Sequence, residues 1–249
     1  DTASAVAAVP AEGDKWAYIS SGTWSLMGIE AAAPVSSPKA FEYNFTNEGG
    51  VFNTIRFLKN IMGLWLVQRC RAAFKKEWDY AALTQMAARA PAFVSLIDPD
   101  WDAFLNPPSM TEAIADFCRK TGQPVPADEG AYVRCCLESL ALQYRLVMQQ
   151  LCEMHNTTFE TLHIVGGGTQ NKLLNQLAAD ATKTTVKTGP VEATVIGNLA
   201  VQAIGLGHIA SLKEARKIIG RSFEMETYTP RDGGRWDAAF DRFLKLKKK

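Results

Sequence analysis

The feature that most constrains the fold of this chain is a short apolar segment that ends in three consecutive glycines. Thr161-Leu-His-Ile-Val165 has the length and composition of a buried strand, and Gly166-Gly-Gly168 follows it directly. Leu173, Leu174 and Leu177 then repeat with helical spacing. Strand, glycine turn and helix in this order are typical of α/β domains in which backbone N–H groups approach a phosphate. The order therefore predicts an α/β fold with an anion site after this strand.

Composition and charge narrow the class of protein. The chain has 249 residues, 47% hydrophobic and 21% charged, which is enough to bury a substantial core. Its 27 basic and 26 acidic residues nearly cancel, so nucleic acid is not an expected partner. No segment approaches the roughly 20 apolar residues of a membrane span. The five cysteines form no metal-type pairs, which favours reduced thiols and a cytoplasmic location.

The first third of the chain predicts two strands and a helix. Residues 16–30 alternate apolar and small polar residues around Ser20-Ser-Gly-Thr23, which indicates two strands joined by a tight turn. Residues 31–53 are rich in Pro, Gly and Asn and are expected to be irregular. Apolar residues at helical spacing predict an amphipathic helix over residues 54–76.

The rest of the chain predicts mainly helices. We interpret the proline-interrupted helical region near 79–127 as an insertion, which includes a short helix capped by Ser109. Further expected elements are a long helix capped by Asp128, a strand near 184–188, a helix over about 193–207, a helix capped by Ser211 and a solvated helix end at 245–249.

Two turns are candidate binding segments. The turn Ser20-Ser-Gly-Thr23 could direct N–H groups and hydroxyls at an anion, or could be an ordinary polar hairpin turn. The segment Gly166-Gly-Gly-Thr-Gln-Asn171 begins like a dinucleotide fingerprint, but Asn171 replaces the last glycine. It permits close approach by a ligand, or serves only the packing of strand against helix.

Polar residues elsewhere also allow two interpretations. Asn60 and Gln68 are eight residues apart, which on one helix means about 12 Å of rise and about 80° of rotation. They could contact one extended ligand, or be surface amides. Asp1 precedes an apolar helical run and is by itself a helix cap. The three histidines lack the spacing of a zinc site, so we expect no protein-bound metal and interpret His163 as a core residue.

Six segments in order resemble the carboxy-terminal half of sugar kinases of the FGGY family. The similarity runs from Asp1 to about Pro230, and the segments that carry it are Asp1-Thr-Ala-Ser-Ala-Val, Tyr18-Ile-Ser-Ser-Gly-Thr-Trp-Ser-Leu26, Asn47-Glu-Gly-Gly, Phe57-Leu-Lys-Asn-Ile-Met-Gly-Leu-Trp65, Gly166-Gly-Gly-Thr-Gln-Asn-Lys-Leu-Leu174 and Gly189-Pro-Val-Glu-Ala-Thr-Val-Ile-Gly-Asn198.

The resemblance implies an actin-like, ribonuclease H-like α/β domain with a mixed sheet flanked by helices. It implies transfer of the γ-phosphate of ATP, with Mg²⁺, to the C1 hydroxyl of L-rhamnulose. Two alternatives stay open: a kinase that acts on L-fuculose or another ketose, and a non-catalytic nucleotide-binding module. Nothing in the 249 residues matches the family's amino-terminal lobe, which carries most sugar contacts. We therefore expect that lobe as a partner, supplied separately or removed.

The resemblance also assigns roles to single residues. Asp1 is similar to the family's general base, and Gly22 with Thr23 to its second phosphate loop. The implied ATP contacts are completed by Gln68, Gly166, Gly167 and Asn171, while Asn60 is the implied sugar contact.

Overall fold

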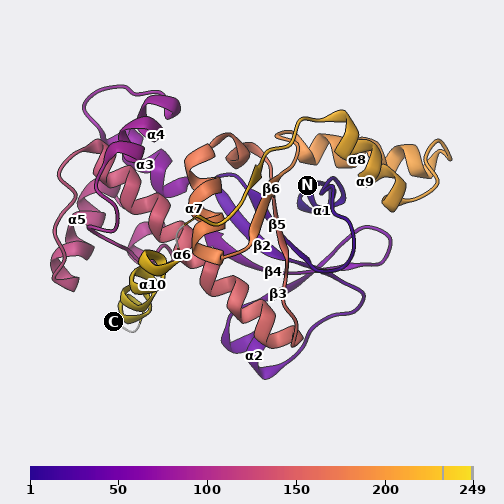
Figure 1. Ribbon diagram of the computed structural model, residues 1–249, viewed down its shortest axis with the longest axis horizontal. Coiled ribbons are helices and arrows are strands. Elements are labelled where there is room, and N and C mark those ends of the chain that lie inside the picture. The colour runs from indigo at the N-terminus through magenta and orange to yellow at the C-terminus, as the bar shows by residue number, and fades with distance from the viewer. Residues whose placement is uncertain (232, 248–249) are drawn as a thin grey trace.

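A mixed β-sheet forms the centre of the computed structural model, which describes residues 1–231 and 233–247 (Figure 1). In the described part of the chain the sheet has seven strands in the order β3-β4-β2-β1-β5-β6-β7. Strand β5 runs parallel to both β1 and β6, and the remaining pairs are antiparallel. The strands are β1 (Trp16–Ser21), β2 (Trp24–Ala31), β3 (Thr46–Gly49), β4 (Ile55–Met62), β5 (Thr161–Val165), β6 (Thr185–Thr188) and β7 (Thr227–Tyr228).

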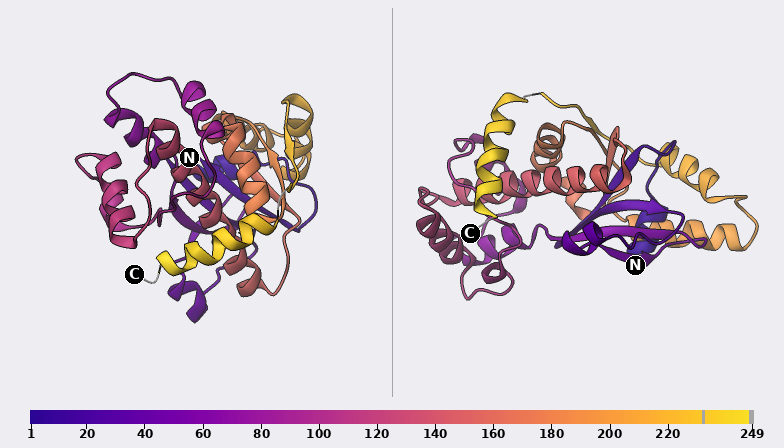
Figure 2. Two further views of the ribbon diagram at one scale, coloured as in Figure 1. Left: turned by 60° about the vertical axis from the view of Figure 1, so that its left-hand side comes forward. Right: turned by 90° about the horizontal axis from the view of Figure 1, so that it is seen from below.

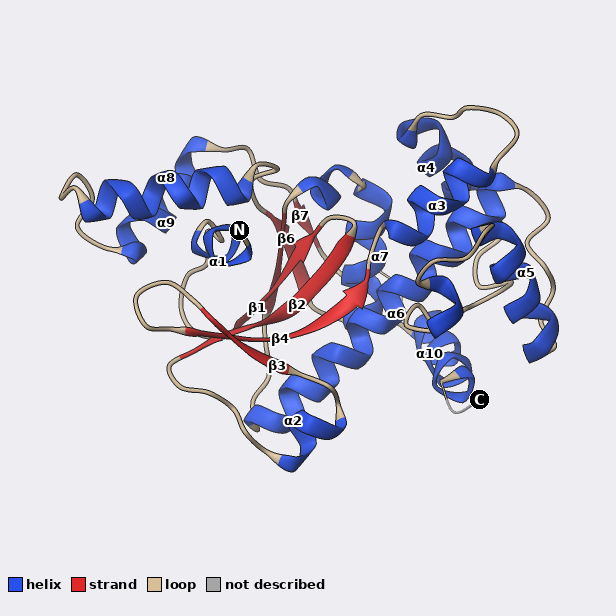
Figure 3. Cartoon of the chain, turned by 180° about the vertical axis from the view of Figure 1, so that it is seen from behind, coloured by secondary structure: helices blue, strands red, loops and turns tan. Residues whose placement is uncertain are grey.

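Helices cover both faces of the sheet and extend beyond one end of it (Figures 1 and 2). Their bounds are α1 (Thr2–Ala7), α2 (Pro38–Glu42), α3 (Trp65–Ala73), α4 (Tyr80–Arg89), α5 (Met110–Thr121), α6 (Glu129–His155), α7 (Lys172–Thr182), α8 (Ala193–Gly205), α9 (Leu212–Ser222) and α10 (Gly234–Leu246). Figure 3 shows α1, α8 and α9 on one side of the strands and α6, α7 and α10 on the other.

The alternation of side chains along β1 explains why there are two hydrophobic clusters. Ala17 and Ile19 are buried in the larger cluster with residues of α6, α7 and α10. Trp16 and Tyr18 point to the opposite face and pack with residues of α1, α8 and α9. The sheet is therefore buried on both faces, as expected for a layered α/β domain.

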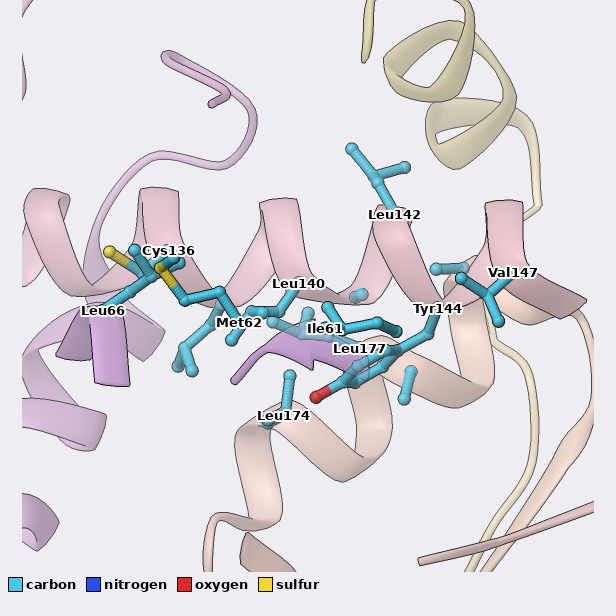
Figure 4. Close-up of a cluster of buried hydrophobic side chains, with 14 of the residues drawn as sticks. Ile61, Met62, Leu66, Cys136, Leu140, Leu142, Tyr144, Val147, Leu174 and Leu177 are labelled. Carbon is cyan, nitrogen blue, oxygen red and sulfur yellow. The ribbon is translucent and has the colours of Figure 1, made fainter. Parts of the chain in front are cut away.

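The long helix α6 is the main element of the larger cluster (Figure 4). Its side chains pack with those of β4 and α7 in this cluster, and Leu140 and Tyr144 are essentially inaccessible to solvent. The hydroxyl groups of Tyr144 and Ser25 are 2.7 Å apart and form a buried hydrogen bond. This bond satisfies two polar atoms that would otherwise be costly to bury.

Most of the predicted elements are present. The hairpin β1–β2, strands β5 and β6, and helices α4, α7, α8 and α9 all lie where the sequence places them. The side chains of Ser109, Asp128 and Ser211 each accept a backbone N–H bond at the helix start for which they were predicted. His163 is 3% exposed, which confirms that it is a core residue.

The helix predicted over residues 54–76 is wrong in its first half. Residues 55–62 form strand β4, and α3 begins only at Trp65. Strand β4 lies between β2 and β3, and side chains on both of its faces are buried, so its apolar residues do not alternate. Asn60 lies on β4 and Gln68 on α3, so the two residues do not share a helix face.

The expectation of irregular structure over residues 31–53 is also partly wrong. Helix α2 begins after Ser37, whose side chain accepts the N–H of Ala40, and β3 pairs along one edge of β4. The short strand β7 was not predicted. The expected helix end in the tail is confirmed as far as Leu246, and the last two lysines lie outside the described residues.

Candidate functional site

A cavity of about 640 Å³ lies beside the ends of β1 and β5. It brings together four segments of the chain: the turn after β1, the start of α3, the first half of α4, and the glycine turn after β5. Five predicted site residues line it, namely Gly22, Thr23, Gln68, Gly167 and Asn171.

Backbone hydrogen bonds fix the β1–β2 turn against α3. The N–H groups of Leu64 and Trp65 donate to the carbonyl oxygens of Gly22 and Thr23 at 3.2 and 2.9 Å. The Thr23 hydroxyl donates to Oε1 of Gln68 at 3.3 Å, so the two predicted side chains are joined directly. Thr23 is exposed and can exchange this bond for one to a ligand.

The glycine turn supplies a cavity wall that lacks side chains. Gly166 has a φ of +90°, and a Cβ atom there would lie 2.8 Å from the carbonyl oxygen of Ser21. Gly167 is exposed, lines the cavity, and has no atom within 4 Å of the position of a Cβ. Gly166 shapes the turn without lining the cavity, whereas a side chain at Gly167 would enter free space.

The start of helix α7 gives the cavity a positive end. Asn171 caps this 11-residue helix, and its Oδ1 accepts the N–H of Leu174 at 3.0 Å. The first N–H groups of a helix carry partial positive charge, which favours an anion there. Lys172 also lines the cavity but is paired with Glu226, and this ion pair raises the pKa of the lysine.

The opposite wall is apolar and was not predicted. It is lined by Leu64, which directly precedes α3, by Val67 of α3, and by Tyr80 and Thr84 of α4. Tyr80 is 49% exposed although it is a large aromatic residue. No binding role was predicted for these residues, because apolar residues at helical spacing are also typical of helix packing. The cavity thus joins an anion-attracting end to an apolar wall, as a small charged and aromatic ligand requires.

Three predicted site residues do not line the cavity: Gly166, Asn60 and Asp1. Asn60 is exposed on β4, opposite Leu26 in the ladder with β2. Asp1 is exposed at the start of α1, and its side chain makes no capping hydrogen bond. The structure therefore gives no support to a capping role for the Asp1 side chain.

Two further kinds of feature are absent from the residues that the structure describes. No group of three or more His, Cys, Asp or Glu side chains could hold a metal ion there. Over the same part of the chain, no helix has the length and apolar character needed to cross a membrane.

The sheet, its helical layers and this cavity define a domain of the sugar-kinase type with the actin-like ATPase fold, and comparison with known families identifies it. The chain belongs to the FGGY family of carbohydrate kinases, because the C-terminal domain of that family matches residues 17–206.

Curated relatives resemble nearly the whole chain. The rhamnulokinase of Bacteroides thetaiotaomicron is 50% identical over 243 residues, which are 98% of this chain and 50% of the relative. That of Bacillus subtilis is 41% identical over 232 residues, 93% of this chain and 48% of the relative. The chain thus spans about half the length of the curated relatives it matches.

Solved structures support the fold. The xylulose kinase from Rhodospirillum rubrum matches with a TM-score of 0.73 and 18% identity, covering 100% of this chain and 50% of the other. The Plasmodium falciparum glycerol kinase with ADP matches with a TM-score of 0.67 and 16% identity, covering 100% and 49%. At these identities the likeness concerns the fold alone.

Proposed function

We propose that this chain is the ATP-binding half of a kinase that phosphorylates the C1 hydroxyl of L-rhamnulose to give L-rhamnulose 1-phosphate. The observation that carries the proposal is the single cavity that joins Gly22 and Thr23, Gln68, and the glycine turn before α7. The proposed sugar is taken from the relatives, which are 41–50% identical to this chain and are named rhamnulokinases.

The cavity has separate regions for the two ends of ATP. The Gly22-Thr23 turn and the start of α7 offer N–H groups, a hydroxyl and a helix end to the phosphates. Leu64, Val67 and Tyr80 offer apolar surface to the base. Gly167 leaves space between these regions, and Gln68 and Asn171 provide amide groups for hydrogen bonds to the nucleotide.

Mg²⁺ fits this cavity only as a companion of ATP. None of the residues that line the cavity is an aspartate or glutamate, which are the side chains Mg²⁺ prefers. We propose that the ion, when bound with ATP, neutralises phosphate charge while Thr23 and Gln68 hold hydrogen-bonding positions nearby. The residues of this chain then act on the nucleotide rather than on the metal.

Asp1 is the proposed general base. It would accept the proton of the C1 hydroxyl as the C1 oxygen bonds to the γ-phosphorus and the bond from that phosphorus to ADP breaks. Because Asp1 does not line the nucleotide cavity, the reaction needs the amino-terminal lobe as a partner to bring the sugar between the two. Asn60 remains a proposed sugar contact on the resemblance alone.

We further propose a cytoplasmic location. Support comes from the cysteines, all five of which are free, and four of which are buried. Burial raises the pKa of the thiols of Cys118 and Cys152 and keeps them protonated.

A chimera tests the proposal. The amino-terminal half of the Bacteroides thetaiotaomicron relative is joined to this chain at Asp1, and release of ADP is measured with L-rhamnulose and with L-fuculose. The proposal expects a higher kcat/KM for L-rhamnulose. A preference for L-fuculose would contradict the assigned sugar, and no turnover in a folded chimera that binds ATP would favour a non-catalytic module.

In the same chimera, Asp1→Asn is expected to lower kcat by about 10²–10⁴-fold, the usual contribution of a positioned general base. Binding of ATP should change little, because Asp1 is outside the nucleotide cavity. Asp14→Asn, which alters another exposed aspartate, is the matched control. Near-normal turnover of the Asp1→Asn chimera would exclude the role of base.

A further inference from the structure

A second cavity, of about 430 Å³, lies between helix α9 and the sheet. Thr161, the first residue of β5, lines it, whereas the nucleotide cavity follows the last residue of the same strand. No residue lines both cavities. The extended chain of β5 places them about 13 Å apart along the strand.

Four basic side chains surround this second cavity. Lys187 comes from β6, and Arg216, Lys217 and Arg221 come from one side of α9. Glu12 is the one carboxylate in the lining. Among the ion pairs of the described residues, Lys187, Lys217 and Arg221 have no partner, so three cations face the cavity against one acid.

Arg216 is held rigidly at the cavity wall. It is paired with Glu30 at 3.0 Å, donates to the carbonyl oxygen of Val6 at 3.2 Å, and lies over the ring of Trp16 at 5.1 Å. Its side chain is 11% exposed. A guanidinium fixed in this way is preorganised, so an anion would lose little side-chain freedom on binding.

His163 forms part of the floor. It is 3% exposed, is paired with Lys187 in the ladder between β5 and β6, and its Nδ1 is buried without a hydrogen-bond partner in the described structure. Burial, with Lys187 and Arg216 nearby, lowers the pKa of His163 to about 4. The imidazole is therefore neutral at pH 7.

We propose that this cavity binds a small organic anion with at least two negative charges, either a phosphate ester or a polycarboxylate. Unpaired cations that converge on a concave site favour a multiply charged ligand over a monovalent one. The nearly balanced charge of the whole chain and the cavity volume of about 430 Å³ favour a small molecule over nucleic acid. The site is separate from that of ATP.

The test uses the imidazole NMR signals of the full chain, which has three histidines. Pyrophosphate and citrate are titrated at pH 7 without nucleotide, and because His163 lines only the second cavity, its signal separates binding there from binding at the nucleotide cavity. The proposal expects a saturable shift of the His163 signal by at least one anion, with His208 unchanged; the two arms separate phosphoryl from carboxylate recognition. The proposal is overturned if neither anion causes a saturable shift at up to ~10 mM, a concentration that corresponds to a binding free energy of about 3 kcal/mol.

Charge removal supplies the second arm. Lys217→Ala with Arg221→Ala should weaken binding at least about tenfold, because two of the three unpaired cations are lost. Lys213→Ala removes an exposed lysine of α9 that does not line the cavity, and should change affinity less than about twofold. Both variants change only exposed side chains, and equal affinities in the two would contradict the proposed site.

Discussion

The hydrogen bond from Thr23 to Gln68 joins two side chains that are 45 positions apart in sequence. Composition and spacing left each of them open between a ligand contact and a polar turn or surface amide, and the resemblance to a family assigned both to one ligand. The structure explains why both can serve it: the turn after β1 is hydrogen-bonded to the start of α3, which carries Gln68. Contacts of this kind depend on the sheet topology, which cannot be predicted from a local sequence pattern.

His163 should make stability depend on pH. Its pKa is lowered to about 4 in the folded protein, whereas the unfolded chain takes up the proton near 6.5. The unfolded state therefore binds more protons between these values, and the free energy of unfolding falls as pH drops through that window. Between pH 7.5 and pH 5, we expect the free energy of unfolding to fall by about 2 kcal/mol more for the chain than for its His163→Gln variant. Urea unfolding in chloride buffers measures both values. Equal losses would show that His163 is not buried in its neutral form.

At the scale of elements, α1 and α8 cross in close contact. A Cβ atom on Gly197 of α8 would lie 1.8 Å from the carbonyl oxygen of Ser4 in α1. Because α1 carries Asp1 at its start, this contact helps to place the proposed base.

Gly197→Ala should therefore destabilise the chain by about 1–3 kcal/mol, because α1 must move away from α8. Gly205→Ala, at the end of the same helix, meets no atom within 4 Å and should be neutral or stabilising by up to about 1 kcal/mol. Thermal unfolding compares the two variants. A stability of Gly197→Ala equal to that of Gly205→Ala would contradict the close crossing.

Elements marked by a pattern of neighbouring residues were predicted from sequence. Strands that form only by pairing with another strand were not. The cap at Asp128 acts through a hydrogen bond to a residue nearby in sequence, and the glycine turn acts through the φ angle of Gly166. Both features involve only neighbouring residues, so they can be predicted from a short stretch of sequence. Strand β4 has apolar residues on both faces, and together with Trp65 and Leu66 at the start of α3 they mimic a helical repeat. Strand β3 consists of Thr-Asn-Glu-Gly, which has little strand preference, and depends on pairing with β4.

At the scale of the whole molecule, the proposed reaction needs more than this chain. Asp1 lies outside the proposed nucleotide cavity, and the chain spans about half the length of its relatives. We expect the chain alone to bind ATP and to release no ADP in response to L-rhamnulose above a blank without sugar. A coupled assay checks this, and sugar-dependent turnover by the chain alone would contradict the need for a second lobe.

The most direct test of the central claim is a calorimetric titration of this chain with ATP, beside Gly167→Val and Gly205→Ala. Gly167 lines the cavity, and a valine there would project into the space proposed for the nucleotide. We expect saturable binding to the chain and to Gly205→Ala. For Gly167→Val we expect an affinity at least about tenfold lower, a loss of about 1.4 kcal/mol in binding free energy, with an unchanged melting temperature. Absence of ATP binding, or equal affinity in the Gly167→Val variant, would contradict it.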